Sequence, residues 1–110
     1  MKRRPRQHDE KYLKFVRTLN CVICGTNISI EAAHVRMADR SVGKRSTGMG
    51  EKPDDKWTLP LCTTHHRRQH EGNEAQFWSD CEKDPVKLAL AIWDARDDYS
   101  RASEIVDEQT

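Results

Sequence analysis

The feature that most constrains this chain is a pair of short motifs, Cys21-x-x-Cys24 and Cys62-x-x-His65, separated by 37 residues. Each motif fits on one tight turn, so both of its side chains can point at the same ion. Three thiolates and one imidazole form a closed tetrahedral ligand set, which is typical of structural Zn²⁺. The sequence therefore predicts a zinc staple. His66 follows His65 directly, so the choice of the fourth ligand stays open between these two histidines.

A staple of this kind suits the composition of the chain. Only 35% of the 110 residues are hydrophobic and 34% are charged, which predicts a single domain with a thin core. Small domains of this type depend on metals or disulfides for stability. A structural zinc site can contribute an apparent folding free energy of about 10–16 kcal/mol, which would compensate for limited apolar burial.

Disulfide pairing is the alternative interpretation of the cysteines. The N-terminus is basic but has no apolar stretch of the kind found in a secretory signal. No segment approaches the roughly 18 apolar residues of a membrane span. We therefore expect a cytoplasmic protein with reduced cysteines, and we expect no association with a membrane. Cys81 falls outside both motifs and is predicted to be a core thiol on a helix.

The charge of the chain is divided unevenly along its length. Through Gly72 there are 15 Lys and Arg against 8 Asp and Glu, and from Asn73 onward there are 4 against 10. The basic part also carries all five histidines. A positive segment of this kind favours a polyanionic partner, whereas a chance division of surface charge is the alternative. The residues expected to bind DNA phosphates are Arg3, Arg4, Arg36, Lys44, Arg45, Arg67 and Arg68.

Periodicity and capping signals predict the order of the elements. The expected order is a helix over residues 12–19 capped by Asp9, a strand over 28–35, a long loop over 38–55, a strand over 57–61, a helix through 65–70 stopped by Gly72, and two helices starting at Asn73 and at Asp84. Residues 1–8 are expected to form a flexible basic arm, residues 9–100 the single domain, and residues 101–110 a frayed polar end.

Three histidines occupy positions that suggest chemistry. His34 ends the first predicted strand, and His66 and His70 lie four residues apart on one helical face. A zinc knuckle, a strand with a histidine, a basic loop, a second strand and a helix with His-x-x-x-His together resemble the HNH nuclease motif. The segments Glu31-Ala-Ala-His34-Val-Arg36, Gly48-Met-Gly-Glu-Lys-Pro-Asp-Asp55 and Leu59-Pro-Leu-Cys62-Thr-Thr-His-His66-Arg-Arg-Gln-His70 resemble the phage recombination-enhancement (Ref) family of HNH nucleases.

This resemblance covers roughly residues 15–80 and carries expectations about fold and activity. It implies an α+β domain with a zinc-stapled ββα-metal (His-Me finger) core, one preceding helix and two following helices. It also implies a metal-dependent DNA endonuclease that acts with a RecA-type recombinase in phage or prophage recombination and repair, in the cytoplasm of a bacterial host.

The resemblance also assigns roles to residues. His34 takes the position of the general base that activates the attacking water, a role that suits an imidazole. His66 and His70 take the positions that hold a catalytic divalent ion, expected to be Mg²⁺, and Asp55 is a plausible carboxylate ligand beside them.

Two departures from the HNH pattern support rival interpretations. Ala33 stands where many HNH sequences carry a metal ligand, and the middle asparagine is missing, with Asp55, Lys56 and Trp57 as the nearby candidates. One rival is a zinc-stabilised DNA-binding module without catalysis. The other is an interaction adaptor that presents the acidic C-terminal helix to a protein partner. The sequence decides neither the oligomeric state nor the form of DNA that is cut.

Overall fold

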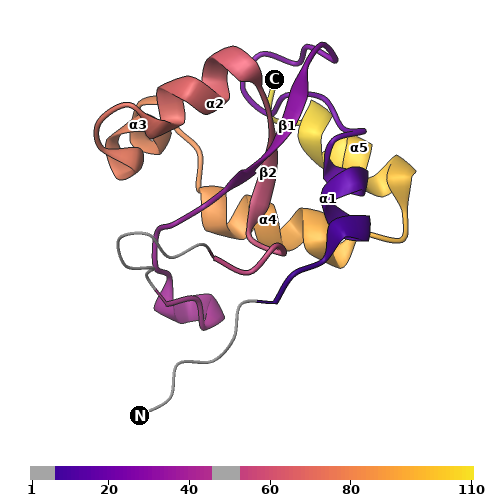
Figure 1. The fold of residues 1–110 in the computed structure, drawn as a ribbon, viewed down its shortest axis with the longest axis horizontal. Helices are drawn as coiled ribbons and strands as arrows, with labels where there is room; N and C mark the ends of the chain where they lie inside the picture. The colour runs from indigo at the N-terminus through magenta and orange to yellow at the C-terminus, as the bar shows by residue number, and fades with distance from the viewer. Residues whose placement is uncertain (1–6, 46–52) are drawn as a thin grey trace.

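The computed structural model describes residues 7–45 and 53–110. Along the chain the elements are α1 (Glu10–Val16), β1 (Ile30–His34), the 3-10 turn η1 (Arg40–Val42), β2 (Thr58–Cys62), α2 (Thr63–His70), α3 (Glu74–Asp80), α4 (Pro85–Asp94) and α5 (Tyr99–Asp107). The two strands cross the middle of the molecule and the helices surround them (Figure 1). The architecture is a small α+β fold, as predicted.

The sheet is an antiparallel pair of strands, and its register determines which residues lie opposite one another. Ile30 lies opposite Cys62 at one end, and His34 lies opposite Thr58 at the other. Strand β2 continues without a loop into α2, because Cys62 is both the last strand residue and the N-cap of the helix. Strand β1, strand β2 and helix α2 therefore pack together as one ββα unit.

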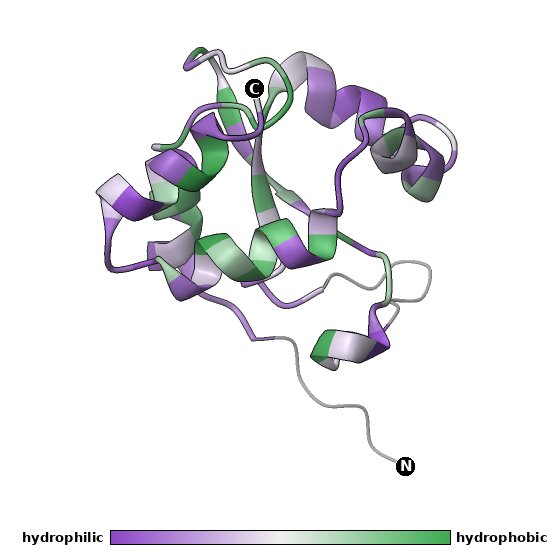
Figure 2. Ribbon diagram, turned by 180° about the vertical axis from the view of Figure 1, so that it is seen from behind, coloured by the Kyte–Doolittle hydropathy of each residue, from purple (hydrophilic) through white to green (hydrophobic). Residues whose placement is uncertain are grey.

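The hydrophobic core lies between the sheet and helices α1 and α4. Leu59 and Leu61 of β2 have no exposed surface, and neither have Val16 of α1 and Ile92 of α4. Apolar residues gather on α4 and the strands, whereas α2 is mostly hydrophilic (Figure 2). Helix α2 buries only Gln69, so it is held by other means than an apolar face.

The helix starts follow the predicted capping chemistry. Asp9 accepts a hydrogen bond from the Tyr12 backbone N–H at the start of α1, and Asn73 and Asp84 cap α3 and α4 in the same way. Gly72 follows α2 with a φ of 77°, in the left-handed region that ends helices. Within the described residues no helix is both long and apolar enough to cross a membrane.

The prediction of a frayed end over residues 101–110 is wrong. Helix α5 occupies most of this segment and buries Ala102, Ile105 and Val106. Its apolar residues follow helical spacing but are diluted by charged neighbours, and Asp98 caps the helix through the Arg101 N–H at 3.0 Å. Three helices, rather than the predicted two, therefore follow the ββα unit in the described chain.

The prediction of a flexible arm over residues 1–8 is wrong for its last two residues. Residues 1–6 lie outside the described part of the chain, but both the N–H and the carbonyl of Gln7 form hydrogen bonds. Its N–H donates to Asp54 Oδ1 at 2.8 Å, and its carbonyl accepts from the Asp55 N–H at 3.0 Å. The folded unit therefore includes residues 7 and 8.

Substitution of Leu61 tests the position of the core. Leu61→Ala is expected to lower the free energy of unfolding by about 2–5 kcal/mol, because it leaves a cavity beneath the sheet. Ile28→Ala is the control, because Ile28 is 71% exposed and its loss should cost less than about 0.5 kcal/mol. Urea unfolding followed by tryptophan fluorescence measures both. Equal losses for the two variants would contradict this core.

Candidate metal centre and histidine site

The four predicted zinc ligands converge. The ligand atoms of Cys21, Cys24, Cys62 and His65 all lie within 4.8 Å of one another. Cys24 Sγ lies 3.9 Å from Cys62 Sγ, close to the separation of about 3.8 Å that tetrahedral Zn–S bonds of about 2.3 Å impose. His65 Nδ1 lies 3.2 Å from Cys62 Sγ, so His65, rather than His66, belongs to the cluster. These residues could bind a structural zinc ion.

Local backbone geometry brings the two ligand pairs together. Gly25 closes the first turn with a φ of 76°, and its N–H donates to the Cys21 carbonyl at 2.9 Å. The Val22 N–H donates to the Pro60 carbonyl at 3.1 Å, which ties this turn to β2. The second pair sits where β2 passes into α2, so the same strand positions both pairs.

The electrostatic environment favours the metal-binding forms of two ligands. Burial lowers the pKa of His65, and the charge of Arg68 lowers it further, so the neutral imidazole is favoured. Burial raises the pKa of Cys21, but hydrogen bonds from the backbone N–H groups of Cys24, Cys62 and Ile23 outweigh it and leave the pKa lowered. A lowered thiol pKa favours the thiolate that zinc requires.

His34 pairs with a buried carboxylate. Its Nε2 lies 2.9 Å from Asp55 Oδ1, and the side chain of Asp55 has no exposed surface. The other oxygen of Asp55 accepts the Asp9 backbone N–H at 2.7 Å and lies 2.7 Å from His8 Nδ1. A carboxylate at Nε2 favours the tautomer with its proton on that nitrogen, which leaves Nδ1 as the acceptor of the neutral ring.

The predicted grouping of Asp55 with His66 and His70 is corrected by this geometry. Across residues 7–45 and 53–110, the Cys₃His cluster is the one group of three or more His, Cys, Asp or Glu residues whose ligand atoms converge. Asp55 lies just before β2, and its carboxylate is directed to the end of β1 instead of to α2. Asp55 is therefore a partner of His34. It lies in the part of the chain where the HNH motif would carry its middle asparagine.

His66 and His70 form a second pair on α2. Their Nε2 atoms lie 3.0 Å apart, and His66 Nδ1 lies 2.6 Å from Glu31 Oε1 on β1. The hydrogen bond from His66 lowers the pKa of Glu31, and burial lowers the pKa of His70. Two imidazole nitrogens at this separation share one proton or face one cation. Sequence reasoning missed Glu31, although its place three residues before His34 is part of the quoted motif.

Two further polar residues hold the backbone around His34. Gln69, which is 2% exposed, donates from Nε2 to the His34 carbonyl at 3.1 Å and to Glu74 Oε2 at 3.1 Å. Glu74 also accepts from the Arg36 N–H at 3.3 Å and from Trp78 Nε1 at 3.1 Å. Helices α2 and α3 therefore hold the backbone at the C-terminal end of β1 in place. No sequence signal distinguishes these two residues from surface glutamine and glutamate.

The basic residues predicted to bind DNA have different environments. Arg67 and Arg68 are exposed on α2 beside the histidines, and Arg45 is exposed in the loop. Arg36 is half-buried. Arg3 and Arg4 lie outside the described residues, as does part of the 48–55 segment.

Lys44 differs from the prediction of a phosphate contact. It is only 4% exposed, and its ammonium lies 5.7 Å from the centre of the Trp57 ring. Burial lowers its pKa. Lys44 is thus packed within the loop, and this position argues against a direct contact with DNA.

The cysteines allow a matched test of the zinc site. We expect one zinc ion per chain, and we expect Cys24→Ser to lose it and to unfold at a lower temperature, because the tetrahedral set is broken. Cys81→Ser is the control, because Cys81 lies outside the cluster at the end of α3. Elemental analysis and thermal unfolding by circular dichroism measure both effects. Retention of zinc by Cys24→Ser would contradict the ligand set.

Comparison with known proteins gives the chain a family. The family described as "Protein of unknown function (DUF968)" matches residues 1–89. A curated relative, "Uncharacterized protein YdfU" of Escherichia coli (strain K12), is 35% identical over 68 residues, covering 62% of this chain and 18% of the relative. The match thus spans less than a fifth of that relative. No solved structure matches. Since the family match covers most of its length, the chain belongs to the DUF968 family.

Proposed function

We propose that this chain is a metal-dependent DNA endonuclease of the HNH type, with His34 as the general base. One observation carries the proposal: His34, at the end of β1, is held through Nε2 by the fully buried carboxylate of Asp55. A histidine oriented by a buried carboxylate is an arrangement that suits general base catalysis. Helix α2 carries the paired histidines and the exposed Arg67 and Arg68. The same helix is hydrogen-bonded to the His34 carbonyl.

The proposed chemistry is hydrolysis of a phosphodiester. Asp55 accepts a hydrogen bond from the Nε2–H of His34, so that Nδ1 can take a proton from water as the water oxygen attacks phosphorus. The bond from phosphorus to the 3′-oxygen breaks as the new bond forms, and the departing oxygen takes a proton from a solvent water. Arg67 or Arg68 would neutralise the phosphate charge that grows in the transition state. In this proposal Asp55 orients His34. It does so in place of the middle asparagine of the HNH motif, which this sequence lacks.

His66 and His70 are the residues that would hold a catalytic ion. A divalent ion there would stabilise the charge on the phosphate and on the leaving oxygen. Glu31 accepts a hydrogen bond from His66 Nδ1, which directs Nε2 away from the strand. Imidazole ligands suit ions such as Ni²⁺ better than Mg²⁺, which prefers oxygen ligands. The donor set therefore favours a transition metal over the expected Mg²⁺.

A DNA-binding zinc module without catalysis is the second candidate. One observation favours it: Ala33, at a position where many HNH sequences carry a metal ligand, is fully buried and offers no donor. The proposed RecA-type recombinase partner is supported only by the family resemblance, so the experiment that separates the candidates includes it.

The decisive assay follows cleavage of single-stranded and supercoiled DNA with Mg²⁺, Mn²⁺ or Ni²⁺, with and without a RecA-type recombinase. We expect His34→Ala to lower the cleavage rate about 10²- to 10⁴-fold, the range for loss of a general base, with zinc content unchanged. Asp55→Asn should also lower the rate, since an amide cannot carry the compensating charge. DNA binding without cleavage by the wild type would instead establish the non-catalytic module. Equal cleavage by wild type and His34→Ala would exclude His34 as the base.

Gln69 provides a test of how the site is positioned. Gln69→Leu should lower kcat about 10- to 100-fold and change KM little, because the hydrogen bond that fixes the His34 carbonyl relative to α2 is lost. Gln76→Leu is the control, because Gln76 is exposed on α3 and bonds Asp80. Steady-state cleavage kinetics separate the two constants. An unchanged kcat for Gln69→Leu would show that this link does not set the geometry.

A further inference from the structure

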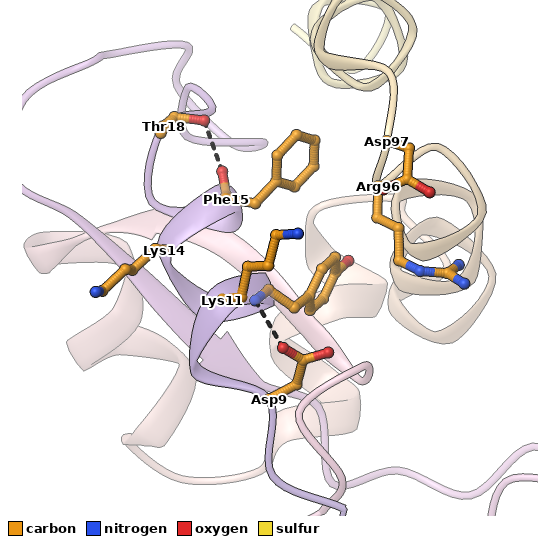
Figure 3. A pocket seen from close by; sticks show the side chains of 8 residues that line it. Asp9, Lys11, Lys14, Phe15, Thr18, Arg96 and Asp97 are labelled. Atoms are coloured by element: carbon orange, nitrogen blue, oxygen red, sulfur yellow. Dashed lines mark hydrogen bonds between the residues drawn. The ribbon is translucent and has the colours of Figure 1, made fainter.

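A cavity outside the histidine site lies between α1 and the turn that joins α4 to α5. Its volume is about 380 Å³, near the lower end of the roughly 300–1,000 Å³ of ligand pockets. Figure 3 shows Phe15 on the α1 side, Arg96 and Asp97 on the opposite side, and Lys11 reaching between them. Its walls are formed by Asp9, Lys11, Tyr12, Lys14, Phe15, Thr18, Arg96 and Asp97. This size suits one small planar group.

An aromatic pair forms one wall of the cavity. Phe15 is half-buried, and its ring stacks on Tyr12 with centroids 6.1 Å apart and planes 24° from parallel. Tyr12 is 3% exposed, and its buried hydroxyl has no hydrogen-bond partner among the described residues. Burial raises the pKa of Tyr12 well above its usual value, so this hydroxyl stays protonated as a donor. A buried donor without an acceptor is costly, and a ligand oxygen would satisfy it.

The charged residues of the cavity complement a nucleotide. Lys11, Lys14 and Arg96 supply positive charge, and Arg96 is fixed by a 2.9 Å hydrogen bond to the Trp93 carbonyl. The Asp9 carboxylate is engaged as the cap of α1. Asp97 offers an acceptor for the exocyclic amino group of a base. Aromatic faces beside cations are the usual means of binding unpaired nucleotides.

The cavity is connected to the candidate base through Asp9 and Asp55. Asp9 lines the cavity, and its backbone N–H donates at 2.7 Å to Asp55, the carboxylate that pairs with His34. A DNA strand at His34 could therefore extend along α1. Bases of a duplex are stacked and paired, so they cannot enter such a cavity unless they are flipped out.

We propose that this cavity binds one unpaired nucleotide of a DNA strand, next to the phosphate that is cut. The position of the cut phosphate rests on the function proposed above, whereas the binding itself does not. The inference assigns a substrate class to this site: DNA that is single-stranded on the α1 side of His34.

The test measures binding without cleavage. Fluorescence anisotropy of a labelled oligodeoxycytidylate, whose bases carry the exocyclic amino group that Asp97 would accept, and of a duplex of equal length, is recorded with the zinc-loaded chain and no added divalent ion. Phe15→Leu should weaken binding of the single strand about five- to a hundredfold, the effect of losing one base stack, and leave duplex binding unchanged. Phe77→Leu is the matched control, because Phe77 is half-buried on α3 outside the cavity. Equal effects of the two variants would overturn the proposal.

Tyr12→Phe separates binding from folding, since it removes only the hydroxyl oxygen. We expect weaker binding of the single strand with an unchanged or higher Tm, because a buried hydroxyl without a partner is lost. A lower Tm with unchanged binding would show that the hydroxyl serves the fold and would overturn its assigned role. Competition by deoxycytidine monophosphate as strong as that of the strand would overturn the strand as occupant in favour of a free nucleotide.

The two proposals fail in different ways. Cleavage by the wild type, together with unchanged single-strand binding by Phe15→Leu, overturns the cavity proposal and leaves the nuclease intact. Weakened binding by Phe15→Leu, together with no cleavage by the wild type, supports the cavity and overturns the nuclease.

Discussion

The pairing of β1 with β2 is the constraint on which both sites depend. Cys62 of the Cys₃His cluster lies at one end of this ladder and His34 at the other, about 13 Å away at the rise of a strand. A slip of one residue would turn every side chain of β1 to the opposite face. The Cys₃His cluster joins the turn after α1 to the end of β2, so an ion bound there would fix the register that orients His34 and Glu31.

Helix α2 shows how a thin core can still support a defined site. It has no apolar face, and Gln69 is its one buried residue. Its position is set by His65 in the metal cluster, by His66 on Glu31, and by Gln69 on the His34 carbonyl. These polar links act at specific atoms, so they fix the rotation of the helix as well as its distance from the strand. Apolar packing alone would leave that rotation less defined.

Local signals predicted much of this structure, and long-range contacts account for what they missed. The caps at Asp9, Asn73 and Asp84 and the Cys₃His set follow from short patterns. The partner of His34 did not, because Asp55 lies 21 residues away across a loop whose path the residue pattern does not define. The choice of His65 over His66 depends on the rotation of α2, which adjacent histidines cannot reveal. Helix α5 was missed because its apolar residues are few.

The contact between Asp9 and Asp55 has a consequence for how such a site can vary among related chains. The donor is the peptide N–H at position 9, so every amino acid except proline can supply it. The side chain at that position also caps α1, so it can change to another capping residue such as Ser, Thr or Asn while the carboxylate beside His34 keeps this bond. Comparison of residue identities would not register the constraint, because it acts on the path of the main chain. The N-terminal segment can diversify in sequence and still deliver the same hydrogen bond.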